Sequence, residues 1–468
     1  MGGLFGVVAQ QDCVSDVFYG TDYHSHLGTR RGGMAVTGGK GFQRSIHSIE
    51  NSYFRTKFEP DLEKFKGHMG IGVISDTDAQ PLVIGSHLGP FALATVAKIN
   101  NLAELTAGAF HRRVHFTETA GGEPTPTEVV AMLITQQESF EAGIAYAQEQ
   151  IQGSCSLVLL TEKGLYAARD RLGRTPLVVG RRNGAVAVAS ETASFPNLGF
   201  ETRRDLGPGE IVFADADGEE TRRPPGRRMQ ICTFLWVYYG YPASSYEQIN
   251  VETVRYRCGG YLAAADPVTP DAVAGIPDSG IGHALGYTRA RTIPYVRPFV
   301  KYTPTWPRSF MPQRQEWRDL VARMKLIPIR SLIRDQRLLF CDDSIVRGTQ
   351  LKDTVQLLFD AGAREVHMRI ACPALIHPCA FLNFSASRST LDLASRRAIA
   401  ELEPDGAEAH LAEYAAAGSP RHQAMVDAIR RRLRLTSLAY QEIRNLVAAV
   451  GLEKEKLCTH CWDASSYF

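Results

Sequence analysis

The chain has 468 residues, of which 44% are hydrophobic and 22% charged, and its formal net charge is +2 at pH 7. This length predicts two or three domains, and the near-neutral charge gives no reason to expect a nucleic-acid partner. The sequence has neither an apolar run long enough for a membrane span nor a signal-peptide pattern, so we expect a cytoplasmic protein. Its nine cysteines are then thiols or metal ligands rather than disulfides.

Short β-rich runs between Gly, Pro and Asn turns fill the first half of the chain. These runs are Leu4–Ala9, Gly70–Ile74, Ser156–Leu160, Leu165–Ala168, Leu177–Val179 and Ala185–Ala189. Helical stretches at Pro126–Gln136 and Ala142–Gln150 lie between them, which predicts a layered α+β domain built on antiparallel sheets. A Pro/Gly/Arg-rich stretch at Arg222–Arg228 indicates a connection, so we place the two domains at 1–230 and 231–468.

In the second half, apolar strand candidates alternate with helical segments. The candidates are Ala272–Ile276, Leu338–Cys341 and Val366–Ala371, a pattern typical of a parallel α/β sheet. The tail from Thr390 to Val450 is rich in Ala, Leu, Arg and Glu, and we expect it to be helical.

The most informative segment of the chain is 338–350. Its apolar run ends in two adjacent carboxylates, Asp342 and Asp343, which a Ser/Gly/Thr loop and a helix from about Thr349 to Phe359 follow. A loop at a helix N-terminus binds phosphate through free amide donors and the helix dipole. Two neighbouring acids can each accept a hydrogen bond from one of two vicinal sugar hydroxyls. Together these features predict a ribose 5-phosphate site at the carboxyl end of a buried strand.

With these residues in view, the chain resembles the amidophosphoribosyltransferases, and the likeness covers nearly its whole length. Four blocks in the second half carry it: Pro277–Gly280, Lys301 to Gln313, Arg323–Leu326 and Asp342–Thr349. In the first half, Gly2–Val7, Ala167–Pro176 and Pro208–Glu210 are similar to the family's glutaminase domain. The resemblance implies an αββα N-terminal-nucleophile-like domain, followed by an α/β type I phosphoribosyltransferase domain with a helical, cysteine-bearing tail.

The resemblance also implies the roles of the site residues toward phosphoribosylpyrophosphate (PRPP). Ser279, Asp342 and Asp343 would surround Mg²⁺, and Arg308, Lys325 and Lys301 would face the diphosphate. The remaining PRPP-binding positions would be Asp278, Gly280, Ser344, Ile345, Val346, Arg347, Gly348 and Thr349. Lys301–Met311 would form a lid that keeps water from the reacting sugar.

The first half departs from the family's glutamine site at four positions. The nucleophilic cysteine falls at Gly2, the oxyanion-hole Asn-Gly at Ile99-Asn100, the carboxylate-binding Arg at Gly70 and the amine-binding Asp at Pro126. None of these replacements can perform the original role, since an isoleucine side chain, for example, cannot donate to an oxyanion. We therefore expect a domain that does not hydrolyse glutamine. Tyr23, His24 and His26 nearby are interpreted as turn residues.

Four of the cysteines match positions that hold a 4Fe-4S cluster in some members of this family. They are Cys232, Cys379, Cys458 and Cys461, and four thiolates could also bind zinc. After Cys379, Phe381–Phe384 replaces the family's usual Gly-Ile-Asp, so contacts at that point are not carried over.

These observations predict an enzyme that forms 5-phosphoribosylamine from PRPP and ammonia, the first step of purine biosynthesis. The ammonia would be free or supplied by a separate glutaminase, and family precedent suggests a homo-oligomer. Two alternatives stay open: a non-catalytic regulatory or scaffold subunit that binds PRPP or nucleotides, and phosphoribosyl transfer to a different amine.

Overall fold

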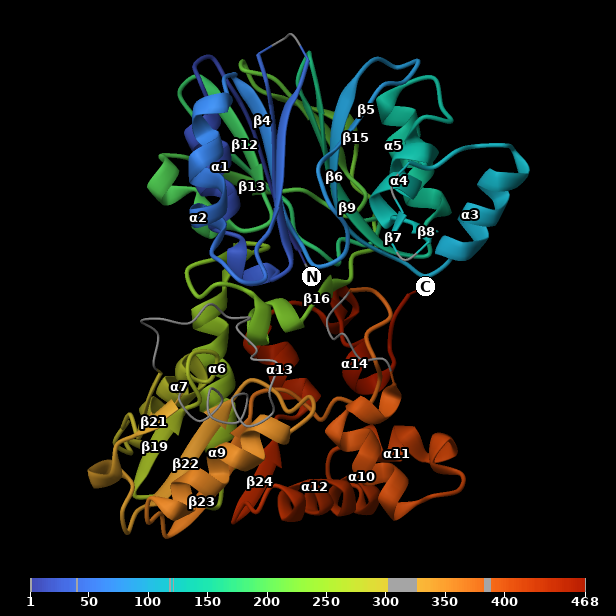
Figure 1. Cartoon of the computed structure of the whole chain (residues 1–468). Helices are drawn as coiled ribbons and strands as arrows, with labels where there is room; N and C mark the ends of the chain where they lie inside the picture. The colour runs from blue at the N-terminus through green and yellow to red at the C-terminus, as the bar shows by residue number, and fades with distance from the viewer. Residues whose placement is uncertain are drawn as a thin grey trace.

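The computed structural model describes residues 2–38, 41–117, 119–120, 122–301, 326–382 and 389–467. The chain forms two lobes that meet at a narrow waist, with the first half of the sequence in one lobe and the second half in the other (Figure 1). Both termini lie close to the waist (Figure 1). Strand β15 ends at Arg223 and β16 begins at Ile231, on the two sides of the predicted domain boundary.

Two antiparallel sheets form the centre of the first lobe. The seven-stranded sheet has, in spatial order, β13 (Glu201–Asp205), β11 (Val178–Arg182), β12 (Ala185–Ala189), β1 (Gly2–Ala9), β4 (Met69–Ser75), β2 (Arg31–Thr37) and β3 (Gln43–Ser48). The six-stranded sheet has β15 (Glu219–Arg223), β14 (Ile211–Ala214), β10 (Leu165–Ala168), β9 (Gly153–Thr161), β6 (Phe91–Ile99) and β5 (Leu82–Ile84). A two-residue pair, β7 (Thr119–Ala120) and β8 (Glu123–Pro124), lies apart from both.

Helices cover the outer face of each sheet. Along β1, Leu4 and Val8 pack between the two sheets, whereas Phe5 and Val7 point to the opposite face, as the two-residue period of a strand requires. The outer cover consists of α1 (Val14–Asp22) and α2 (Phe54–Phe58) on one side, and α3 (Leu102–His111), α4 (Pro126–Ile134) and α5 (Phe140–Gln150) on the other. The αββα layering expected from the sequence is confirmed.

The second lobe is built on a four-stranded parallel sheet in the order β19–β22–β23–β24. Its elements are β19 (Ala272–Gly275), β22 (Arg337–Asp342), β23 (Glu365–Ile370), β24 (Ser437–Tyr440), α6 (Val251–Ala264), α7 (Ile281–Arg291) and α9 (Thr349–Asp360). Helices α6 and α7 cross closely because Gly259 has no side chain. A Cβ at this position would lie 1.9 Å from the carbonyl oxygen of His283. The α/β class predicted for this half is confirmed.

The tail departs from the expectation that it is helical throughout. Helices α10 (Ala394–Leu402), α11 (Leu411–Ala415), α12 (Pro420–Arg432) and α13 (Ile443–Val450) are present, but Ser437–Tyr440 forms the edge strand β24. The strand has four residues and one buried side chain, Leu438, and a segment this short does not show whether its hydrophobic period is that of a strand or of a helix.

Short elements join the lobes at the waist and border the second sheet. Strands β16 (Ile231–Cys232) and β25 (Leu457–Cys458) pair in parallel, a π-helical turn covers Leu235–Tyr239, and α14 (His460–Asp463) follows β25. Two antiparallel pairs complete the lobe: β17 (Ser245–Tyr246) with β18 (Ile249–Asn250), and β20 (Phe299–Lys301) with β21 (Leu326–Pro328).

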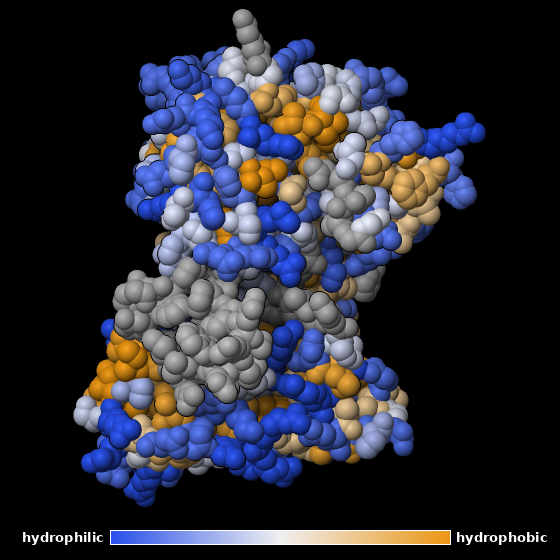
Figure 2. All heavy atoms as spheres, viewed as in Figure 1, coloured by the Kyte–Doolittle hydropathy of each residue, from blue (hydrophilic) through white to orange (hydrophobic). Residues whose placement is uncertain are grey.

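Hydrophilic side chains cover most of the visible face of both lobes, with scattered apolar patches (Figure 2). Within the described part of the chain, no helix combines the length and apolarity needed to cross a bilayer.

Candidate active site

The two adjacent acids lie where the sequence places them, at the carboxyl end of β22. Asp342 ends the strand, and the backbone N–H of Asp343 donates to Asp342 Oδ1 at 2.9 Å. Ser344 Oγ donates to Asp343 Oδ2 at 2.5 Å, and Ser279 hydrogen-bonds to both carboxyls. Burial raises the pKa of both acids, and repulsion from Asp343 raises that of Asp342 further. A cation bound here would therefore replace a proton or relieve this repulsion.

A second loop closes on the acids from the neighbouring strand β19. It contains the cis Pro277–Asp278 peptide and Ser279, and Gly280 caps the N-terminus of α7. The loop lies against β22 so tightly that a Cβ at Gly280 would be 2.2 Å from the carbonyl oxygen of Cys341. Because parallel strands end at the same edge of a sheet, both loops present their polar groups to one place.

The segment after the acids forms the expected turn into a helix. Gly348 caps the 12-residue α9 with a φ of +73°, a left-handed conformation that glycine adopts without strain, and Thr349 begins the helix. Ile345 is buried, and the carbonyl of Val346 accepts from the N–H of Ala394 at 2.7 Å. The helix dipole and its first amides favour an anion at this end.

One basic side chain approaches the Asp278 loop from β20. Lys301 Nζ lies 2.6 Å from Asp278 Oδ2, and both side chains are exposed. A cavity of about 200 Å³ opens beside them, lined by Gly275, Pro277, Asp278, Ile281, Tyr295, Arg297, Pro298, Phe299 and Lys301. Arg347 lies on the other loop, 3.5 Å from Asp392. Arg308, Lys325 and all of the predicted lid except Lys301 lie outside the described residues.

Sequence reasoning missed a buried cation behind the acids. Arg255, on α6, is 3% exposed and donates to the carbonyls of Trp236, Tyr238 and Gly240 at 2.9–3.1 Å. Its charge counteracts the rise in the pKa of Asp343. The sequence signal for this buried cation is weak. It consists of one arginine in a helical segment, with buried residues at helical spacing on either side of it.

In the first lobe, the position of the expected nucleophile has no room for a side chain. Gly2 lies in β1 opposite Ser75, and a Cβ added to it would be 2.6 Å from the backbone oxygen of Ile74 and 3.2 Å from Val96 Cγ2. The cavity beside Gly2 has a volume of only about 10 Å³, roughly enough for one water molecule.

A buried hydrogen-bond network fills the space next to that cavity. Gln80 Nε2 donates to Ser75 Oγ, Asp78 Oδ1 and the carbonyl of Thr95, and Gln80 Oε1 accepts from the N–H of Thr95. Asp78 Oδ2 accepts from the N–H of Thr127 at 3.1 Å, and the hydroxyls of Thr95 and Thr127 are 2.8 Å apart. These groups satisfy one another, so none is left to bind a substrate.

The other altered positions are also occupied by structural contacts. Gly70 is buried in β4, where a Cβ would be 2.6 Å from Val17 Cγ2, and Pro126 is the first residue of α4. Lys98 and Asn100, at the end of β6 and just after it, reach across the waist to the carbonyls of Cys379 and Ala380 respectively.

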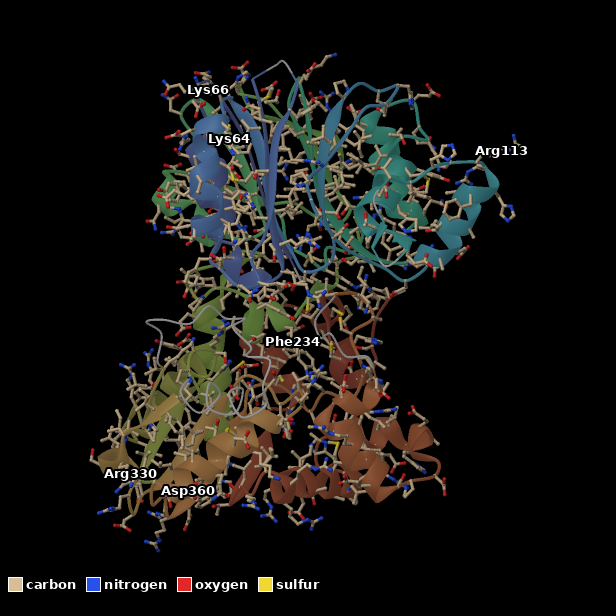
Figure 3. The ribbon with its side chains drawn as sticks, in the orientation of Figure 1. Lys64, Lys66, Arg113, Phe234, Arg330 and Asp360 are labelled. Atoms are coloured by element: carbon tan, nitrogen blue, oxygen red, sulfur yellow. The ribbon has the colours of Figure 1, made fainter. Side chains whose placement is uncertain are left out.

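Phe234 lies at the waist between the two lobes (Figure 3), where it stacks on Trp462 and follows Cys232, the first of the four predicted ligand cysteines, by two residues. Cys232 and Cys458 are register partners in the β16–β25 pair, and Cys379 and Cys461 are hydrogen-bonded through their side chains. The bond to Cys461 lowers the pKa of Cys379 to about 6. All four thiols interact with one another, although the described residues contain no group of three or more His, Cys, Asp or Glu side chains arranged to hold a metal ion.

Comparison with known proteins adds to this geometry. A glutamine amidotransferase domain family matches residues 68–197. The amidophosphoribosyltransferase of Methanothermobacter thermautotrophicus is 31% identical, over 98% of this chain and 93% of that protein, and the Mycobacterium tuberculosis enzyme is 31% identical over 98% and 85%. Among solved structures, the glutamine PRPP amidotransferase of Bacillus subtilis, complexed with ADP and GMP, superposes with a TM-score of 0.85 and 27% identity, covering 99% of this chain and 96% of that one.

Proposed function

Because this chain belongs to the amidophosphoribosyltransferase family, whose members are pentosyltransferases, we propose that it forms 5-phosphoribosylamine from PRPP and ammonia without hydrolysing glutamine itself. The observation that carries the proposal is a contrast between the two lobes. The acids, the phosphate loop and the Asp278 loop meet at one sheet edge in the second lobe, whereas the pocket in the first lobe is closed around Gly2.

The transfer reaction requires charge stabilisation at two places. Loss of diphosphate from the anomeric carbon leaves positive charge on the ribose and negative charge on the leaving group. Asp342 and Asp343 face the first, since they accept from the ribose hydroxyls and lie close to the sugar. The loop from Ser344 to Thr349 holds the 5-phosphate at the start of α9.

Magnesium fits the chemistry of the donor set. Asp342, Asp343 and Ser279 offer hard oxygen atoms. The pKa values of the two carboxyls are raised, which indicates that nearby positive charge does not fully neutralise them. When bound, Mg²⁺ neutralises the diphosphate oxygens and improves the leaving group. Lys301 adds positive charge beside Asp278, and the family resemblance assigns the same role to Lys325 and Arg308. Asp278 and Gly280 position the loop that meets the diphosphate.

The nitrogen source is the point at which this chain differs from its family. The Cβ of a cysteine at residue 2 would lie 2.6 Å from the carbonyl oxygen of Ile74, and the neighbouring polar groups bind one another. Ammonia therefore comes from solution or from a separate glutaminase.

The four cysteines at the waist fit an iron–sulfur cluster by the chemistry of their donor set. Four soft thiolates suit a 4Fe-4S cluster, with zinc as the alternative. All four thiols interact with one another. The cluster would link β16, the segment at Cys379 and the C-terminal tail. Unpaired cysteines and such a cluster suit a reducing, cytoplasmic location.

The test follows diphosphate release by the holoprotein with Mg²⁺ and PRPP. We expect turnover with ammonium and none above background with glutamine. The Asp343→Asn variant should lose turnover, and Asp353→Asn, an exposed position on α9, serves as the matched control. Equal turnover with both nitrogen donors would refute the proposal, as would PRPP binding without turnover with any amine, which would indicate a regulatory subunit.

A further inference from the structure

Two cations of the first lobe lie against the four-cysteine site. Lys98, near the end of β6, donates through Nζ to the carbonyl of Cys379. Asn100, two residues later, donates to the carbonyl of Ala380 at 2.8 Å. The stretch that aligns with the family's oxyanion motif therefore no longer faces a glutamine pocket and binds the cysteine-bearing segment of the other lobe.

The second cation, Arg174, is buried, and it forms no ion pair with a carboxylate among the described residues. Its residue is 2% exposed, and its guanidinium lies 3.6 Å from the centre of the Phe381 ring. Nη2 donates to Ser466 Oγ at 3.0 Å and to the carbonyl of Tyr467 at 2.5 Å, and the side chain also hydrogen-bonds to Cys458. None of these partners among the described residues carries a full negative charge unless Cys458 is a thiolate.

One donor of Arg174 remains unused. Its Nε is buried and has no hydrogen-bond partner in the described part of the chain. A buried N–H of a charged group that lacks an acceptor is costly, so native structures rarely keep one. Among the described residues, Cys458 is thus the hydrogen-bond partner of Arg174 that could carry a negative charge.

A cubane held by four thiolates carries a net negative charge, and its sulfide ions accept hydrogen bonds. Donors and positive charge close to such a cluster stabilise it and raise its reduction potential, because the reduced form is the more negative one. Lys98 and Arg174 approach the cysteines from the first lobe, whereas all four cysteines belong to the segments that follow residue 230.

We propose that Lys98 and Arg174 stabilise the iron–sulfur cluster at the waist by charge and hydrogen bonding, so that the first lobe serves as one wall of the cluster site. The inference rests on the cluster assigned under the proposed function. It accounts for the retention of a complete αββα domain whose glutamine pocket is closed: the domain shields the cluster and attaches to the segment that carries Cys379.

The experiment uses anaerobically purified holoprotein and the variants Lys98→Gln and Arg174→Gln. The matched controls are Lys163→Gln and Arg171→Gln, two exposed positions of the same lobe. Iron and sulfide content, the midpoint potential and the rate of bleaching in air are measured. Arg174→Lys keeps the charge and tests for rescue if Arg174→Gln does not fold.

We expect the two test variants to shift the midpoint potential to more negative values and to bleach faster, by roughly tenfold for Arg174→Gln, as for loss of a hydrogen bond to a charged group. The controls should match the parent protein. A brown protein whose Lys98 and Arg174 variants keep the parent potential and bleaching rate would overturn this inference alone. A colourless parent protein that contains zinc or no metal would overturn both this inference and the proposed cluster. The proposed transferase activity is tested separately, by ammonium-dependent turnover.

Discussion

Placing a thiol at residue 2 should not produce glutamine hydrolysis. In Gly2→Cys the new Cβ would be placed 2.6 Å from the carbonyl oxygen of Ile74, a backbone atom held in the β1–β4 ladder. Ordinary contacts of this kind begin near 3.4 Å, so the strands must separate by most of an ångström. Overpacking of this kind costs about 1–3 kcal/mol, which corresponds to a fall in Tm of about 2–12 °C for a domain of this size.

The assay compares thermal unfolding and glutaminase activity of Gly2→Cys, Gly2→Ala and the control Gly85→Ala. Nothing lies within 4 Å of a Cβ at Gly85, so the control should keep the parent Tm. We expect both Gly2 variants to lose stability to a similar extent, since the clash begins at Cβ, and Gly2→Cys to release no glutamate from glutamine. A Gly2→Cys protein with the parent Tm and measurable glutamine hydrolysis would refute the reasoning that the pocket is closed.

Three further outcomes are expected. Asp342→Asn should lower ammonium-dependent kcat by roughly 100-fold, since the site loses a charge that the cationic sugar and the metal require, and unchanged kcat would exclude this role. Asp78→Ala should lower the free energy of unfolding in urea by about 1–3 kcal/mol, because the buried N–H of Thr127 loses its acceptor; a change below about 0.5 kcal/mol would mean that the network is not closed. Burial lowers the pKa of His24 from 6.5 to about 4. Between these pH values the histidine is protonated in the unfolded chain and neutral in the folded chain. The free energy of unfolding should therefore fall by about 3 kcal/mol as pH falls from 6.5 to 4. His24→Gln should flatten this acid limb in pH-dependent urea unfolding, and an unchanged limb would assign it to other groups.

The part of the site that could be predicted from sequence is the part whose pattern is local. The apolar run before Asp342 identifies a strand buried on both faces, and the Ser/Gly/Thr loop with the following amphipathic segment identifies the turn into α9. The short β-rich runs between turn residues likewise predicted β1 and β10, both of which are buried along their whole length.

What the sequence could not supply depends on contacts between distant segments. His24 was interpreted as a turn residue, yet it is fully buried, with Nδ1 on the carbonyl of Gly20 and Nε2 accepting from the N–H of Glu191. The closure of the first pocket by Gln80 and the approach of Arg174 to Cys458 also require the fold. Gln80 belongs to no motif, and the block Ala167–Pro176, which contains Arg174, gives no sign that the partners of Arg174 lie in the other lobe.

The central claim is that the second lobe aminates PRPP while the first lobe supplies no nitrogen. The most direct measurement incubates the holoprotein with Mg²⁺, PRPP, ¹⁵N-ammonium and unlabelled glutamine together, and determines the isotope in the aminated sugar phosphate. We predict that the product nitrogen is entirely ¹⁵N at every glutamine concentration. Unlabelled nitrogen that rises in the product with glutamine would contradict the account.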